Sequence, residues 1–162
     1  MSKAQLDAID VKILTVLQEN ARLTNAELAE QVGLSPSPCL RRVKLLEERG
    51  VISRYAAVVD QEKVGLPVSG FVFIKLDRPN EESIDRVEKE IARCPEVVEC
   101  YLMTGWCDYL LRVVTADLAS YERFLKERLN KIPAIANLET SFALRQVSYM
   151  SALPIKPSRQ AS

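Results

Sequence analysis

Apolar residues recur at helical spacing over the first fifty positions of this chain and alternate, strand-like, further along. The first apolar stripe predicts a helix over residues 6–22 and consists of Leu6, Ile9, Ile13, Val16 and Leu17. A second helix is expected to begin at Thr24, because Thr24 and Glu27 have the spacing of a capping box. Gly33 is expected to end that helix, since glycine enters the left-handed region without steric penalty.

A third helix is predicted almost at once, in the stretch SPSPCLRRVKLLEERG. Ser35 is expected as its N-cap, with its hydroxyl bonded to the N–H of Ser37, because the two prolines of the first turn have no N–H. Helical spacing places Cys39, Leu40, Val43 and Leu46 on one side and Ser37, Arg41, Lys44 and Glu48 on the other. Arg42 lies at the boundary, within reach of a phosphate, and Leu45 lies unexplained on the polar side.

Helix, tight turn and a second helix with a cationic side are the pattern of a DNA-reading helix-turn-helix, whose second helix places its N-terminal residues at base edges. Arginine offers a forked donor to guanine or phosphate, and serine can donate or accept. An ordinary helical hairpin with a solvated basic face has the same pattern. Spacing alone therefore leaves both interpretations open.

The residues after the third helix change character. Residues 51–60 are rich in β-branched side chains and are predicted to be extended, either as a wing or as the start of a connector. Arg54 and Tyr55 are expected to touch the DNA backbone or, equally, only to tether the domains. Residues 61–67, which contain glycine and proline, are predicted as the linker.

Two strand-helix-strand units are predicted beyond this linker. Strands are expected at residues 68–76, 97–103, 108–114 and 137–147. Asn80 and Asp117 are predicted to cap the two helices, the second with its inward side made of Leu118, Tyr121, Phe124 and Leu125. The chain is thus predicted to be α+β, with a three-helix, winged helix-turn-helix domain followed by a ferredoxin-like βαββαβ domain.

Both faces of the predicted sheet are apolar. Phe71 and Phe73 alternate with Val72 and Ile74 along one strand, whereas the two helices cover only one face. An uncovered apolar face is an interaction patch, so a homodimer through this domain is predicted as the minimum unit.

Composition and charge narrow the classes of function. The formal net charge is zero, which argues against coating of nucleic acid by bulk electrostatics. The basic charge is local, because residues 35–54 contain five cations and two anions. Three net charges give modest affinity, so useful DNA binding is expected to need several copies of the domain.

The same composition bears on location and metals. No apolar run approaches the roughly 20 residues that span a bilayer, and no cleavage signal is evident, so a cytoplasmic protein without membrane contact is expected. Histidine is absent, and the four cysteines form no CxxC pair. Structural free thiols, no metal site, no cofactor and no catalytic residues are therefore predicted.

The turn TGWCDY at residues 104–109 concentrates groups that a small-molecule site needs. Gly105 permits close backbone approach, Thr104 has a hydroxyl, and the Asp108 carboxylate is suited to an α-ammonium group. Backbone N–H groups of the turn would meet a carboxylate, and Met103 would meet an apolar side chain. A plain hairpin turn is the alternative.

Four stretches that span nearly the whole chain resemble the Lrp/AsnC, or feast/famine, family: IDVKILTVLQENAR, LSPSPCLRRVKLLEERGVI, ECYLMTGWCDYLLRV and SFALRQVSYMSALP. The resemblance implies a sequence-specific DNA-binding transcriptional regulator that responds to an amino-acid effector, with dimers that assemble further, commonly to octamers. Many relatives have an acidic residue directly after the glycine, where this chain has Trp106. Effector identity is therefore not inherited; branched-chain and sulfur amino acids are the first candidates.

The expected site residues follow from the pattern and the resemblance together. The predicted contacts to double-stranded DNA are Thr24, Asn25, Ser35, Pro36, Ser37, Pro38, Arg41, Arg42, Lys44 and Arg54. The resemblance places at the effector site Met103, Thr104, Gly105, Asp108 and Tyr109, with Thr140 and Ser141 of the last strand opposite. The predicted divisions are a DNA-binding domain at 1–60, the linker at 61–67, an effector and oligomerisation domain at 68–153 and a disordered tail at 154–162.

Two other classes of protein remain as alternatives. An enzyme would need a nucleophile-base pair or a phosphate loop, and Asp108 beside Cys107 is the only conceivable pair in the sequence. An architectural DNA-binding protein would share the fold but bind no effector.

Overall fold

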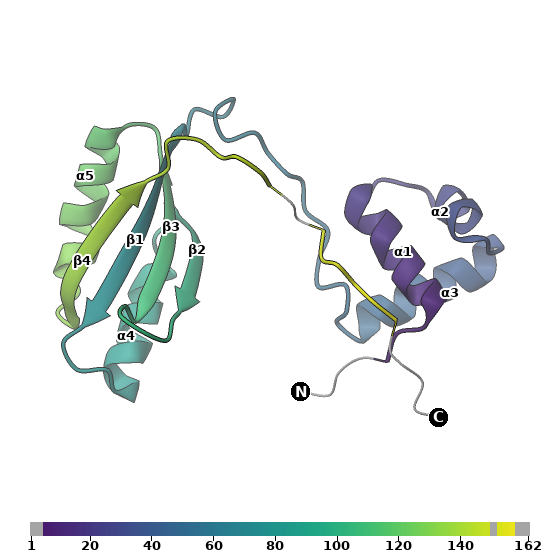
Figure 1. Ribbon diagram of the computed structural model, residues 1–162, viewed down its shortest axis with the longest axis horizontal. Helices are drawn as coiled ribbons and strands as arrows, with labels where there is room; N and C mark the ends of the chain where they lie inside the picture. The colour runs from purple at the N-terminus through teal and green to yellow at the C-terminus, as the bar shows by residue number, and fades with distance from the viewer. Residues whose placement is uncertain (1–4, 150–151, 158–162) are drawn as a thin grey trace. The chain divides into compact units, whose positions relative to one another are not determined.

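The computed structural model describes residues 5–149 and 152–157 and divides the chain into two compact units (Figure 1). The first unit contains the residues up to Ala57 together with those from Ser148 onward, and the second unit is Val58–Val147. The chain thus leaves the first unit once and returns to it.

Three helices form the first unit: α1 (Ala8–Glu19), α2 (Asn25–Val32) and α3 (Pro36–Glu48). As predicted, α2 begins after the N-cap Thr24 and ends at Gly33, which has a φ of 77°. Residues from all three helices meet in one buried core, made of Ile13, Leu14, Leu28, Ala29, Val32, Cys39 and Leu46.

The prediction for Leu40 is wrong, because this side chain is 44% exposed. Leu40 follows the fully buried Cys39 by one residue and therefore lies about 100° away from it around the helix. Leu46, seven residues or about two turns after Cys39, is buried on the same side as Cys39. The buried stripe of α3 is thus narrower than the sequence suggests.

The C-terminal segment packs on the first unit over its described part, where the sequence predicted a disordered tail. Ile155 lies against the helical core. The N–H of Leu153 donates to Oε1 of Gln18 at 2.6 Å. Residues 158–162 of that prediction lie outside the described residues.

The connection between the units also differs from its prediction. Residues 51–60 form no strand, and the Tyr55 hydroxyl donates to Oε1 of Glu47 at 2.8 Å, which favours the connector over the wing. The expected linker at 61–67 folds onto the second unit, because the Gln61 side chain donates to Oγ of Ser69 at 3.0 Å and accepts from Arg112 at 2.9 Å.

The second unit is a four-stranded antiparallel sheet with strand order β2-β3-β1-β4 and two helices packed on one face (Figure 1). Its elements are β1 (Val68–Leu76), α4 (Glu81–Ile91), β2 (Val97–Leu102), β3 (Tyr109–Thr115), α5 (Leu118–Glu127), the 3-10 helix η1 (Leu129–Lys131) and β4 (Ile135–Phe142). The order confirms the ferredoxin-like βαββαβ prediction, and the caps at Asn80 and Asp117 form as expected.

Two details at the ends of elements are corrected. Leu118, predicted inward, is the first residue of α5 and is 60% exposed. β4 was predicted over 137–147 but ends at Phe142, because the ladder with β1 ends at the pair Gly70–Phe142. Strand length here is set by the partner strand.

The two faces of the sheet differ, because α4 and α5 pack on only one of them. Val72, Ile74 and Leu111 are fully buried beneath the helices. The opposite face, called here the open face, carries the half-buried side chains of Phe71, Phe73 and Leu110, and neither α4 nor α5 packs on it.

All four cysteines are free thiols. Cys39, Cys94 and Cys107 are buried, and Cys100 is exposed. Burial raises the pKa of the Cys39 and Cys94 thiols, which fits structural rather than reactive cysteines. None of the helices in the described part of the chain has the length and hydropathy of a bilayer-spanning segment.

Candidate functional site

The turn between α2 and α3 is built by the side chains at the start of α2. The carboxylate of Glu27 accepts from both the N–H and the hydroxyl of Thr24 at 2.7 Å, and these bonds lower the pKa of Glu27. The amide of Asn25 donates to the Pro36 carbonyl at 2.8 Å. Of these two predicted DNA contacts, Thr24 thus caps α2, and Asn25 joins the start of α2 to the first turn of α3.

The start of α3 differs in one respect from its prediction. Ser35 is the N-cap, but its hydroxyl makes no capping hydrogen bond, so the expected bond to Ser37 is wrong. Pro36 and Pro38 hold their own φ angles near the helical value and have no N–H to satisfy. The rigid prolines therefore define this helix start, while both serines stay exposed.

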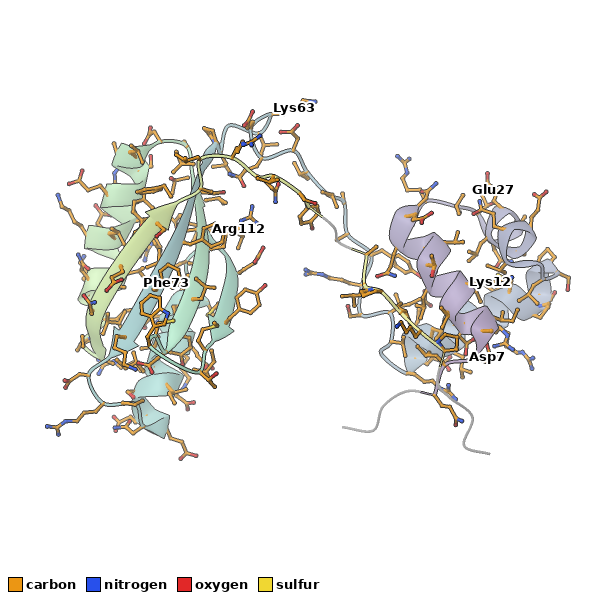
Figure 2. The ribbon with its side chains drawn as sticks, in the orientation of Figure 1. Asp7, Lys12, Glu27, Lys63, Phe73 and Arg112 are labelled. Atoms are coloured by element: carbon orange, nitrogen blue, oxygen red, sulfur yellow. The ribbon has the colours of Figure 1, made fainter. Side chains whose placement is uncertain are left out.

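Arg42 lies in a different place from its neighbours. One guanidinium nitrogen, Nη1, lies 2.7 Å from Oδ2 of Asp7 and 2.7 Å from Oδ1 of Asp10. Asp7 and Asp10 form the capping box of α1, and Figure 2 shows Asp7 at the start of that helix. The prediction that Arg42 reaches a phosphate is therefore corrected, because its guanidinium joins α3 to α1.

Arg42 and Asp7 shift each other's ionisation. Hydrogen bonds from the backbone of Asp10 and then from Arg42 lower the pKa of Asp7. Its two carboxylate partners raise the pKa of Arg42. The charge of Arg42 is thus paired with carboxylates of the same unit.

The side of α3 that points away from the core is called here the outer face; it consists of Ser37, Arg41, Lys44 and Glu48. Arg41 and Lys44 are exposed and form no ion pair with any side chain that the structure describes. Arg54, beyond the helix, is likewise exposed and unpaired among the described residues. The outer face is a rigid helical surface with two available cations around the middle of the helix.

The second candidate is the turn of residues 103–108 between β2 and β3, called here the effector turn. Asp108 anchors it, because its Oδ2 accepts from the N–H of Leu76 at 2.8 Å and its Oδ1 lies 3.0 Å from Nζ of Lys75. These two bonds, the backbone one first, lower the pKa of Asp108. Asp108 therefore holds the turn through both carboxylate oxygens, each of which keeps a second lone pair, and its expected role as an ammonium ligand stays a prediction.

The tip of the effector turn faces solvent. Met103, Thr104 and Gly105 are exposed, and Gly105 has a φ of 121°, which a residue with a Cβ rarely adopts. Trp106 is 62% exposed, and its ring centroid lies 4.8 Å from that of Phe73, with the two rings tilted by 39°; Figure 2 shows Phe73 on the sheet. The tip therefore offers a hydroxyl, backbone groups and an aromatic wall.

The remaining residues of the predicted effector set lie elsewhere. Tyr109 is buried beneath α4, where its hydroxyl donates to Oε1 of Glu88 at 3.2 Å and burial raises its pKa. Thr140 also lies on the helix side of the sheet, 2.6 Å from the Tyr121 hydroxyl. Ser141 is exposed on the open face. The structure thus brings together Met103, Thr104 and Gly105 but not Tyr109 or Thr140.

Sequence reasoning missed two groups of residues. Lys75 is the ion partner of Asp108. On the open face, Arg112 lies 3.0 Å from Glu99 and donates to Gln61 at 2.9 Å (Figure 2). The available signal was a cation at an outward position of an otherwise apolar strand.

Comparison with known proteins covers both units. The chain matches the winged helix-turn-helix DNA-binding family over residues 6–53 and the Lrp/AsnC ligand binding domain over residues 69–153. The Bkd operon transcriptional regulator of Pseudomonas aeruginosa is 43% identical over 152 residues, which cover 94% of this chain and 99% of that protein.

Two solved structures are similar along nearly their whole length. An AsnC family transcriptional regulator from Agrobacterium tumefaciens has 44% identity and a TM-score of 0.88, covering 92% of this chain and 97% of that chain. A transcriptional regulator from Neisseria meningitidis, in complex with L-Met, has 39% identity and a TM-score of 0.88, covering 92% and 96%. The resemblance noted in the sequence is thereby confirmed. This chain belongs to the Lrp/AsnC family of transcriptional regulators, with a helix-turn-helix DNA-binding domain followed by a ligand-binding domain.

Proposed function

We propose that this regulator contacts double-stranded DNA through the outer face of α3 and responds to an amino acid bound at the effector turn. The observation that supports the DNA contact is that neighbouring cations of α3 differ in their ion pairing. Arg42 is bound to Asp7 and Asp10, whereas Arg41 and Lys44 point outward without an ion partner among the described residues. Free cations on a rigid helix suit a major groove.

The effector proposal is supported by the match to a ligand-binding domain and by the L-Met complex of the Neisseria meningitidis relative. A sulfur amino acid is accordingly the first effector to test. Within one chain the tip at Met103, Thr104 and Gly105 is open to solvent, so the site would be completed by a second copy. The uncovered open face supports a dimer, and further assembly of dimers, as in an octamer, is part of this proposal.

Titration calorimetry with L-Met, L-Leu and L-Asp, together with DNA binding by anisotropy, tests both parts. We expect heat with L-Met or L-Leu and a change in DNA affinity of about fivefold or more, the range of ordinary allosteric coupling. Thr104→Val should reduce the heat without altering assembly. DNA binding without heat from any amino acid would support the architectural alternative and reject the effector proposal.

A further inference from the structure

Two exposed leucines border the outer face of α3. Leu40 and Leu45 are each 44% exposed, although large aliphatic side chains on a helix usually face a core. Together with the outer face they line one shallow groove along the helix, formed by Ser37, Leu40, Arg41, Lys44, Leu45 and Glu48. In the described part of the chain, neither leucine is among the buried or partly buried residues that form the core of the first unit.

Their positions around the helix are specific. At about 100° per residue, Leu40 lies about 40° to one side of Lys44, and Leu45 lies about 40° to the other side of Arg41. The two cations therefore stand between the two leucines. An α-helix that lies in the major groove with such a face presents both leucines to the base edges, one on each side of the two cations.

The major-groove edges carry one apolar group, the C5-methyl of thymine, and aliphatic side chains recognise it by contact. Burying a methyl group against a leucine removes apolar surface from water on both partners. The cations on the same face attract the phosphates of DNA and so bring the exposed leucines close to the base edges. This charge complementarity favours DNA over an apolar protein partner as the occupant of the groove.

We propose that Leu40 and Leu45 are specificity residues that read thymine methyl groups on the two sides of α3. The inference rests on the proposed DNA contact of the outer face and adds the base that this face selects. It assigns a role to Leu45, which neither the helical core nor the ion pairs explain.

The test uses the full chain and a duplex selected by it from a random library. Each thymine of that duplex is replaced in turn by deoxyuridine, which lacks only the methyl group. We expect one or more replacements to weaken binding by about threefold to tenfold, because each removes a methyl group that is buried against a leucine. At the base pair that each leucine contacts, its alanine variant (Leu40→Ala or Leu45→Ala) should bind the thymine duplex and the uracil duplex with equal affinity.

The controls distinguish a failure of DNA binding by α3 from a failure of methyl recognition by the two leucines. Leu118→Ala removes an exposed leucine from the other unit and should keep the methyl sensitivity. Circular dichroism should show that each alanine variant retains its helices. Absence of duplex binding by the unmodified chain would overturn the DNA proposal itself. Binding with no methyl effect, with a selected site that lacks thymine, or with methyl sensitivity retained in both leucine variants would overturn this inference alone.

Discussion

Nη1 of Arg42 lies 2.7 Å from Oδ1 of Asp10, and this ion pair joins α3 to the first turn of α1. The Asp10 side chain is only 13% exposed, so this ion pair is better shielded from solvent than a pair on the surface. A helix that reads DNA must be held in a fixed position by the residues behind it. Arg42 is therefore a positioning residue for its neighbours Arg41 and Lys44.

Arg42→Ala is expected to lower the free energy of unfolding of the first unit by about 1–3 kcal/mol, because it leaves a mostly buried carboxylate without its charged donor. Urea denaturation followed by far-ultraviolet circular dichroism measures the loss. Arg41→Ala is the matched control and should stay within about 0.5 kcal/mol, since Arg41 is exposed. Fluorescence of Trp106, the single tryptophan of the chain, follows the second unit. Equal destabilisation by both variants would contradict the assignment.

Lys44→Ala is expected to weaken DNA binding at every sequence and to reduce the slope of log affinity against log salt by about one for each copy in contact. The physical reason is that a lysine paired with a phosphate releases a condensed counterion. Anisotropy titrations at four salt concentrations give the slope. Lys63→Ala, an exposed lysine of the second unit, serves as the control. An unchanged slope for Lys44→Ala would show that this side chain does not face the phosphates.

The features predicted well from the sequence depend on neighbours along the chain. The capping box of Thr24 with Glu27, the left-handed Gly33 and the caps at Asn80 and Asp117 all involve residues within four positions of one another. Periodicity of 3.6 or 2 is local in the same sense. Element type and order could therefore be derived before any tertiary contact was known.

The features that were missed depend on residues far apart in the sequence. Arg42 and Asp10 are 32 positions apart, and so are Asp108 and Leu76. In the sequence, Arg42 and Asp108 look like free ligands because no residue near either of them along the chain indicates a partner. The length of β4 is likewise decided by β1, and Tyr109 turns inward because the register with β1 places it beneath α4.

Leu110→Asp is expected to convert a dimer into a monomer, raising the dimer dissociation constant by about a hundredfold or more, because it buries an uncompensated charge in the proposed interface. Leu110 lies on the open face between Phe73 of β1 and Tyr101 of β2. Sedimentation velocity over a range of concentrations measures the change. Leu118→Asp adds the same charge on the helix side, where Leu118 is exposed, and should leave the dimer intact. A monomeric unmodified chain, or equal loss in both variants, would argue against this interface.

Asp108→Asn is expected to remove a pH-dependent part of the stability of the second unit. The N–H of Leu76 and then Lys75 hold the pKa of Asp108 below its ordinary 3.8. A carboxyl whose pKa is lower in the folded state stabilises the fold above the unfolded value, and this contribution is lost as the pH falls from there through the folded pKa. The asparagine amide still has an oxygen for the Leu76 N–H but no charge for Lys75. The difference in unfolding free energy between the two proteins should therefore be constant near neutral pH and shrink below about pH 4.

Trp106 provides the measurement, because it lies two residues from Asp108 and its ring lies against that of Phe73. Urea titrations followed by its fluorescence, from about pH 7 to about pH 2.5, give the free energy for each protein over the relevant window. Asp117 also has a lowered pKa, from the backbone of Ser120, so the unmodified chain loses stability in acid for more than one reason. Subtracting the variant curve isolates Asp108. A difference that stays constant down to the lowest pH would mean that the charge of Asp108 does not hold the effector turn.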